Sequence, residues 1–345
     1  MHCWFFSTGI GLQGSVEKAV RAAGVTVGSS LHKLSENMAD RILHSKSDNT
    51  NKKYFDVFRR WKHFCLSHDC CALPANPVHI ALYLNFLLDK HSSFSVISSV
   101  VYAIKWVHDI NGHPDPTTNS FVRHLLETSK RCSHKPVCKK EPLTADILIN
   151  LCNYFSGNSD LLVIRDLSMI LLCFSGFLRF NELSNLLCSD LKICDSYLVL
   201  KIRKSKTDQY RHGDEVVISK GQTVACPLTM IRKYIEIAEI NLDDNAFLFK
   251  PIFRSGSTCK LIHKNKCLSY TGTRQAILKR LSLVCDVKNV GLHSLRAGGA
   301  TVAANNGVND RCFKRHGRWK SEACKDGNVA DSLQSRLSVT QKLGL

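Results

Sequence analysis

Four short basic motifs in the second half of the chain contain the side chains best suited to chemistry. They are R-x-x-E-L at 179–183, K-S-K-T at 204–207, H-S-L-R at 293–296 and G-R-W at 317–319. A guanidinium group keeps its charge at any ordinary pH and can bond two oxygens of one phosphate at once. Histidine can exchange a proton near neutral pH. Fixed cations beside a histidine are suited to stabilising negative charge that builds up on a phosphate.

Local signals place the first two motifs on predicted elements. Gly176 ends one predicted helix and Arg179 opens the next. Glu182, one turn further on, can hold the arginine or cap the helix. Lys204 and Lys206 fall in the polar turn of a predicted hairpin, so both amines would lie at its tip.

The rest of the second half predicts a mostly helical domain with a small sheet. Residues 197–219 are two alternating segments around a basic turn, which predicts a β-hairpin. Thr144 caps one predicted helix, and residues 160–175 form a long apolar one. Further helices are predicted at about 228–240, 272–285, 294–305 and 320–326, and the H-S-L-R motif lies at the start of the third.

The first half predicts a compact helical domain. Residues 1–28 contain glycine and serine with weak periodicity, so we expect a loosely ordered tail there. From residue 48 onward, Tyr54, Phe58, Trp61 and Cys65 are spaced by three or four residues, which is one face of a helix. Three further helices are predicted at about 76–90, 96–110 and 117–132.

A basic segment separates the two halves. Lys135, Lys139 and Lys140 lie in it, beside a proline and few apolar residues. Such a segment suits an interdomain linker near phosphate, and it equally suits a solvated loop. The predicted organisation is a tail at 1–28, a helical domain at 29–132, a linker at 133–141 and a second domain at 142–345.

Charge and composition favour a nucleic-acid partner. The 345 residues include 47 Lys and Arg against 29 Asp and Glu, a formal net charge of +18. A surplus of that size repels itself in a compact fold unless a polyanion offsets it. A basic surface without a partner is the alternative. The hydrophobic content of 44% is that of a folded, soluble chain rather than a disordered one.

Several classes of protein are disfavoured by what the sequence lacks. It has no Walker loop, no Rossmann glycine set and no H-E-x-x-H motif, so we expect no cofactor and no metal. Its 16 cysteines include no C-x-x-C pair, which favours a reducing compartment. The longest apolar stretch contains Arg165 and Asp166 and predicts a buried helix rather than a membrane span. For a basic DNA binder of a nucleated cell, these features predict the nucleus.

The four motifs, in this order, resemble those of the tyrosine recombinases, the phage integrase family. The ending RLSVTQKLGL at 336–345 looks like the endings of recombinases from Crypton- and DIRS-type mobile elements of eukaryotes. The resemblance spans about residues 30–345. It implies a mainly α fold, with an N-terminal four-helix core-binding (SAM-like) domain and a mixed α/β catalytic domain that contains a small β-sheet insert.

The resemblance also implies roles for individual residues. Arg179 and Arg296 match the two arginines that hold the non-bridging oxygens of the reacting phosphate. Lys206 matches the lysine that protonates the departing 5′-hydroxyl, and Lys204, two residues earlier, is the alternative. His293 matches the acid/base position of the family.

The family's nucleophile is missing from this sequence. Trp319 stands where other members have histidine or tryptophan, and in the family the nucleophilic tyrosine follows that position by nine residues. Asn328 stands there instead, and no tyrosine follows Tyr270. An asparagine amide does not attack phosphate, and the hydroxyl of Ser332, a helical turn further on, is poorly activated. We therefore expect that this chain alone forms no covalent phosphotyrosyl intermediate.

The function that the resemblance implies is DNA integration and site-specific recombination, by a DNA-binding protein of a mobile element that cannot itself cleave. The expected partners are double-stranded DNA and further copies of the chain, as a dimer or tetramer. A C-terminal helix at about 332–343 would dock on a neighbouring subunit or pack on its own domain. Two alternatives are an active integrase that receives its tyrosine in trans, and a domesticated regulatory or scaffold protein.

Overall fold

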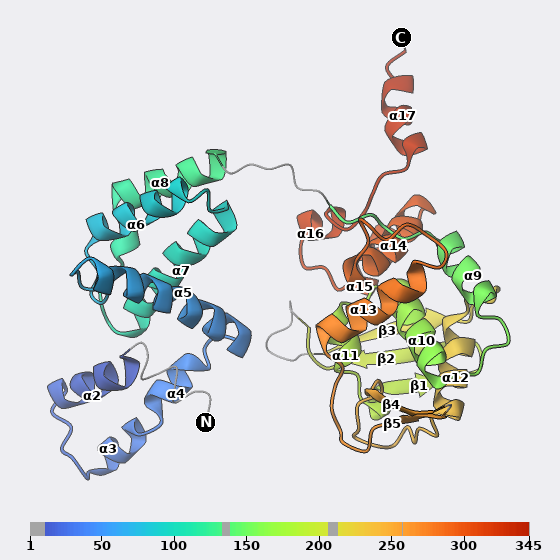
Figure 1. Cartoon of the computed structure of the whole chain (residues 1–345), viewed down its shortest axis with the longest axis horizontal. Coiled ribbons are helices and arrows are strands. Elements are labelled where there is room, and N and C mark those ends of the chain that lie inside the picture. The colour runs from blue at the N-terminus through green and yellow to red at the C-terminus, as the bar shows by residue number, and fades with distance from the viewer. Residues whose placement is uncertain (1–10, 133–138, 206–212, 257, 345) are drawn as a thin grey trace. The chain divides into compact units, whose positions relative to one another are not determined.

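The computed structural model describes residues 11–132, 139–205, 213–256 and 258–344 (Figure 1). The chain divides into two compact units, Met1–Val137 and Cys138–Leu345. Each unit has its own cluster of buried hydrophobic side chains, and each is described by itself.

The N-terminal unit buries one apolar core between four main helices. They are α5 (Asp48–Ser67), α6 (Pro77–Asp89), α7 (Phe94–Ile110) and α8 (Ser120–Cys132), with the short helix η1 (Pro116–Thr118) before α8. Trp61, Ile80 and Ile104 are fully buried in this core. The cap of α6 lies where the sequence predicts it, since the Asn76 side chain accepts a hydrogen bond from the backbone N–H of Val78.

The prediction of a loosely ordered tail at 1–28 is wrong for residues 12–22. Residues Leu12–Ala22 form helix α2, which is followed by α3 (Ser30–Ser35) and α4 (Met38–Leu43). Leu12 and Val16 of α2 are buried in the core of the N-terminal unit, and Val20 packs against it. The spacing of these three apolar residues is helical, but the glycine and serine between them hide the pattern.

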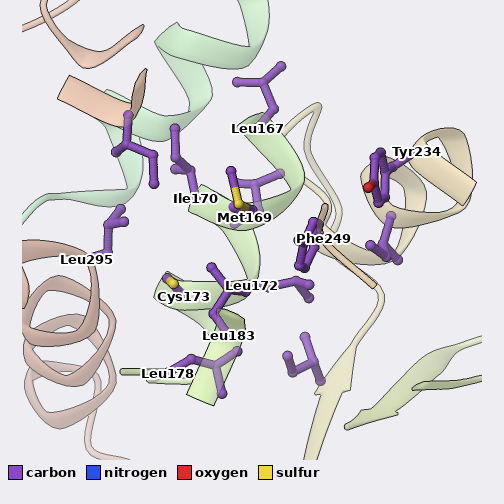
Figure 2. Packing of buried hydrophobic residues seen from close by; sticks show 14 of the residues in the cluster. Leu167, Met169, Ile170, Leu172, Cys173, Leu178, Leu183, Tyr234, Phe249 and Leu295 are labelled. Carbon is purple, nitrogen blue, oxygen red and sulfur yellow. The ribbon is translucent and has the colours of Figure 1, made fainter. Parts of the chain in front are cut away.

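The C-terminal unit is built around α10 (Leu161–Ser175), and all but three of its residues are buried. The helices α12 (Pro227–Ile237), α13 (Tyr270–Leu281) and α14 (Leu292–Asn305) pack against it. Figure 2 shows Leu172 of α10 among side chains of this core that come from distant parts of the chain, such as Phe249 and Leu295. Arg165 and Asp166, the two charged residues of α10, form a buried ion pair. Asp166 accepts from Arg165 at 2.9 Å and from Arg280 at 3.2 Å.

A three-stranded antiparallel sheet contains the predicted hairpin. Its order is β1 (Leu191–Ile193), β2 (Tyr197–Ile202) and β3 (Asp214–Ser219), and β2 and β3 pair from Tyr197 with Ser219 to Ile202 with Asp214. Leu198, Leu200 and Ile202 alternate into the core. A second hairpin, β4 (Ile252–Ser255) and β5 (Thr258–Leu261), lies where the sequence predicted no strand.

The remaining elements of the C-terminal unit are short. They are α9 (Ala145–Tyr154), α11 (Phe180–Ser184), η2 (Cys188–Asp190), α15 (Asp310–His316), α16 (Glu322–Asp326) and α17 (Leu333–Gln341). Of these, η2 and α15 were not predicted. The predicted fold class is confirmed, because the described chain is mostly helical with small sheets. Over the same ranges, no helix combines the length and apolarity needed to cross a membrane.

Candidate functional site

Arg179 is held at the start of α11 by a buried carboxylate. Beyond α10 the chain turns through Gly176 and Phe177 and enters α11, with Arg179 as the N-cap residue. The Arg179 backbone N–H donates to Glu182 Oε2 at 2.9 Å, and Arg179 Nη1 donates to Glu182 Oε1 at 2.7 Å. Glu182 therefore fills both roles that the sequence suggests, since it caps the helix and holds the arginine.

Arg296 reaches the same turn from α14. Its side chain is buried, and it donates to the carbonyl oxygens of Phe177 and Gly317, the latter at 2.6 Å. The guanidinium carbon lies 4.9 Å from the centre of the Trp319 ring, a cation–π contact. Burial, and then the charge of Arg179, lower the pKa of Arg296 from its ordinary value. An anion bound beside it would favour the charged form.

Two glycines of α14 let this helix pack closely enough for the Arg296 side chain to reach the turn after α10. A Cβ atom on Gly298 would lie 2.1 Å from the carbonyl oxygen of Leu143, and one on Gly299 would lie 2.0 Å from that of Phe174. Backbone atoms cannot yield to such contacts, so a larger residue at 299 would push α14 away from α10, and one at 298 would push it away from the segment before α9. The glycines that follow Arg296 in the sequence therefore fix the depth at which its side chain enters the site.

The other residues of the predicted cation set lie at the surface or outside the described ranges. His293 is the second residue of α14, one turn before Arg296, and it is exposed. Lys204, just after β2, is also exposed. Lys206 and Lys135 lie outside the described residues, so the alternative between Lys204 and Lys206 stays open.

The end of the predicted linker lies beside the start of α14. Lys139 and Lys140 are exposed. The backbone N–H of Glu141 donates to the carbonyl oxygen of Asn289 at 3.0 Å, and Lys140 Nζ donates to Asn289 Oδ1 at 3.4 Å. These bonds attach the two lysines close to the helix that contains His293.

Trp319 forms a wall of the site and leaves one donor unused. It is buried in a small aromatic cluster, with ring centres 5.1 Å from Phe313 and 6.0 Å from Phe177. Its indole Nε1–H is buried and has no acceptor among the residues that the structure describes. A buried donor without an acceptor is costly, and such groups are often completed by a ligand.

The segment that contains Asn328 is docked on its own unit. Asn328 follows α16 and its Nδ2 donates to the carbonyl oxygen of Cys324 at 2.7 Å. Val329 packs against the aromatic cluster around Trp319. The backbone N–H of Ala330 donates to the hydroxyl of Thr301 on α14 at 3.0 Å. Position 328 is therefore held near the site by its neighbours, while its own amide only caps the preceding helix.

Arg318 belongs to the site, although it is not among the predicted catalytic residues. Its side chain is buried, and its Nη2 donates to Glu182 Oε2 and to the carbonyl oxygen of Phe177, both at 2.8 Å. Its position within G-R-W was the only signal in the sequence. A lone arginine in a basic chain is ordinarily a surface residue, and nothing in the spacing shows that this one points inward.

The site has more positive than negative charge. Burial alone would raise the pKa of Glu182, but the charges of Arg318, Arg179 and Arg296 leave it below its ordinary value. Three guanidinium groups thus surround one ionised carboxylate among the residues described, an excess of two positive charges. An oxyanion bound there would offset part of that excess.

Two curated proteins are similar to this chain over most of its length. The "Integrase/recombinase xerD homolog" of Selenomonas ruminantium is 29% identical over 295 residues, 84% of each chain. The "Recombinase cre" of Escherichia phage P1 is 20% identical over 315 residues, 89% of this chain and 83% of that protein. No protein-family model matches the chain.

A solved structure has the same fold. A lambda integrase tetramer bound to a Holliday junction matches with a TM-score of 0.54 and 16% identity, over 85% of this chain and 76% of that one. The fold is therefore that of the tyrosine recombinases. The two curated relatives, both recombinases by name, support the tyrosine recombinase/integrase family for this chain.

Replacing Glu182 by glutamine should destabilise the C-terminal unit at neutral pH. Removing the carboxylate leaves buried guanidinium groups without their counterion, which costs about 3–5 kcal/mol when one partner of a buried pair is lost. Because folding lowers the pKa of Glu182, its contribution is present at neutral pH and is lost as the pH falls below the ordinary carboxyl value.

Urea unfolding of Glu182→Gln and the parent protein at several pH values checks this. The difference in free energy of unfolding should be largest near neutral pH and shrink under acid. A difference independent of pH would contradict the role given to the carboxylate. Asp326→Asn, whose exposed carboxylate lies 3.8 Å from Lys325, is the control and should change stability little.

Proposed function

We propose that this chain is a recombinase-like DNA-binding protein of a mobile element, and that it binds DNA as a recombinase does but cannot cleave it alone. The observation that supports this best is the basic site around Glu182, with Asn328 at the place of the nucleophile. Arg179 and Arg296 would each donate to the non-bridging oxygens of one DNA phosphate. The indole N–H of Trp319 would supply a third donor.

The exposure of the three arginines favours a phosphate reaching Arg179 first. The Arg179 side chain is 18% exposed, whereas that of Arg318 is 2% exposed. Burial of the other cations lowers the local dielectric and strengthens their pull on an anion that enters. His293 is exposed one turn from Arg296, where it could exchange a proton with the solvent or the DNA.

Neither Asn328 nor Ser332 offers a replacement nucleophile. The Asn328 amide is engaged with the Cys324 carbonyl. The Ser332 hydroxyl accepts from the backbone N–H of Ser335 at 3.1 Å as the cap of α17, and it also bonds the Ser335 hydroxyl at 2.8 Å. Neither partner is a base that could remove its proton. We infer that the cations would bind the phosphate and that no covalent bond would follow.

The docking of the 328 segment favours loss of activity over supply of tyrosine in trans. Val329 and Ala330 hold that segment against the unit's own α14 and aromatic cluster. A tyrosine from a neighbouring subunit would have to displace these contacts before it could reach the phosphate. The likeness of the C-terminal residues to those of Crypton- and DIRS-type elements supports an origin in such an element and a nuclear location.

Restoring tyrosine should restore covalent chemistry. We expect Asn328→Tyr, incubated with a pool of nicked candidate element ends, to form a covalent protein–DNA adduct that denaturing gels detect. Asn328→Phe is the matched control, because it has the same ring without the hydroxyl, and it should form no adduct. Adduct formation by the unaltered chain would refute the proposed loss of cleavage. DNA binding without adducts from any variant would mean that the cation site no longer supports chemistry.

A basic groove in the N-terminal unit is a second surface that suits phosphate. It has a volume of about 660 Å³ and lies between α5 and the start of α7. Its cations are Lys52, Lys53, Arg59 and Arg60, and Ser95 and Ser99 supply hydroxyl groups. The mixture of amines, guanidinium groups and hydroxyls is the set that commonly contacts the DNA backbone. We propose that this groove binds duplex DNA.

Removing the four groove cations should weaken DNA binding and its salt dependence together. The logarithm of the binding constant falls as the logarithm of the salt concentration rises, and each lost phosphate contact makes that negative slope less steep by about 0.9. Fluorescence anisotropy with a labelled duplex, at several salt concentrations, measures both quantities for the fourfold alanine variant. The matched control replaces four exposed cations of α2–α4 by alanine, namely Lys18, Arg21, Lys33 and Arg41. Equal effects of the two variants would rule out a specific role for the groove.

The last helix supports assembly of several copies on DNA. None of the residues of α17 is buried, and Leu333 and Val339 are 69% and 64% exposed. Apolar side chains on a helix that its own unit leaves uncovered suit a contact with another molecule. We propose that a second copy of the chain covers α17 when both are bound to neighbouring DNA sites.

Truncation after Asp331 should abolish cooperative binding and leave single-site affinity unchanged. Gel-shift titrations on one-site and two-site duplexes separate the two effects. The double variant Leu333→Ser and Val339→Ser should reproduce the truncation if the apolar side chains are responsible. Unchanged cooperativity in both variants would rule out α17 as the contact.

A further inference from the structure

Arg318 adopts a backbone conformation that arginine rarely takes. Its φ is +55°, in the left-handed region, and the φ of Phe177 is +45°. Residues with a Cβ atom populate this region sparsely, and they stay there only when surrounding contacts hold them. Both strained residues lie in the candidate site, and they are bonded to each other through Arg318 Nη2 and the Phe177 carbonyl oxygen.

The Arg318 guanidinium connects two parts of the site that are far apart in the sequence. Nη1 donates to the carbonyl oxygen of His316 at 2.7 Å, on the turn that leads to Trp319, and to that of Gly176 at 3.2 Å. Nη2 donates to Phe177 and to Glu182, before and within α11. One planar group thus joins the turn after α15 to the start of α11.

The acceptors of Arg318 are shared with the two arginines proposed to bind phosphate. Glu182 Oε2 accepts from Arg318 and from the Arg179 backbone, and Oε1 accepts from the Arg179 side chain. The Phe177 carbonyl oxygen accepts from both Arg318 and Arg296. Moving Arg318 would therefore disturb both Glu182, which holds Arg179, and the Phe177 carbonyl, which holds Arg296.

We infer that Arg318 is a positioning residue, which fixes the Arg179 and Arg296 guanidinium groups through Glu182 and the Phe177 carbonyl. The inference rests on the proposed function, because fixed positions matter to a reaction only if the two arginines hold the phosphate. Arg318 itself has no free Nη–H group to offer DNA, because its two Nη atoms make four hydrogen bonds to protein acceptors, whereas those of Arg296 make only two.

Lysine should not replace Arg318. Its single nitrogen can donate at most three hydrogen bonds from one point, whereas Arg318 makes four bonds from two nitrogens that face different parts of the site. Arg318→Lys keeps the positive charge and loses the planar connection. Arg318→Gly removes the side chain and relieves the left-handed backbone, so it tests the connection without adding strain.

The first experiment measures the rate of adduct formation in the Asn328→Tyr protein. Adding Arg318→Lys or Arg318→Gly should slow this rate by about 100-fold, a loss that a displacement of about 1 Å in a catalytic group can cause. Affinity for the same duplex should change by less than about threefold, because backbone contacts elsewhere supply most of it. Arg165→Lys is the matched control, since Arg165 is buried and paired with Asp166 inside α10 and lies in no candidate site. It should leave the rate unchanged.

The second experiment observes the arginine side chains directly and needs no activity. In protein with isotope-labelled arginine, a held guanidinium group gives sharp, slowly exchanging N–H resonances. We expect such resonances from Arg179, Arg296 and Arg318, and loss of the first two in the Arg318 variants. Arg165→Lys should preserve them.

The two experiments separate failure of this inference from failure of the proposed function. If Asn328→Tyr forms no adduct, the proposal that Arg179 and Arg296 hold a DNA phosphate ready for attack is wrong. The resonances alone then decide the role of Arg318. Unchanged Arg179 and Arg296 resonances in both Arg318 variants would overturn the inference. A mobile Arg318 side chain in the unaltered protein would also overturn the inference. That observation does not require any variant to fold.

Discussion

The candidate site depends on one buried carboxylate that lets arginines approach one another. Guanidinium groups at short range repel, and the repulsion grows as burial lowers the dielectric. Glu182 stays ionised among them and accepts from both Arg179 and Arg318. The end of α10, the start of α11 and the turn before Trp319 therefore meet at this carboxylate. Any arrangement without it would drive the cations apart and separate these elements.

Much of the fold could be predicted because its helices are periodic and capped. The apolar face of α5 and the Asn76 cap of α6 follow from spacing and side-chain chemistry alone, and so does the antiparallel pairing of β2 with β3. The missed elements lack those signals. α15 has seven residues, of which only Phe313 is buried, so no periodicity can appear. In the hairpin of β4 and β5, no residue is buried, β4 does not alternate, and β5 alternates over only four residues.

The site was predictable where residue type alone identifies a role and unpredictable where backbone geometry decides. Arg179 with Glu182 follows from an i, i+3 pairing at a helix start. The inward direction of Arg318 depends on a left-handed φ at its own position and on carbonyl groups contributed by a turn about 140 residues earlier. No local pattern contains that information. The paired glycines of α14 were visible in the sequence, but their purpose becomes clear only from the backbone atoms that they approach.

The docking of the 328 segment has a consequence for how such a chain would behave among intact copies. Val329 and Ala330 anchor the segment, so the identity of residue 328 matters little to folding. Under the proposed function, a chain that had lost the nucleophile would then be a stable competitor rather than a misfolded remnant. Such a protein, occupying one position in a mixed complex at an element's ends, would stall strand exchange for every partner in that complex. Under the proposed function, proteins of this kind would act as dominant inhibitors and would limit the spread of the element that encoded them.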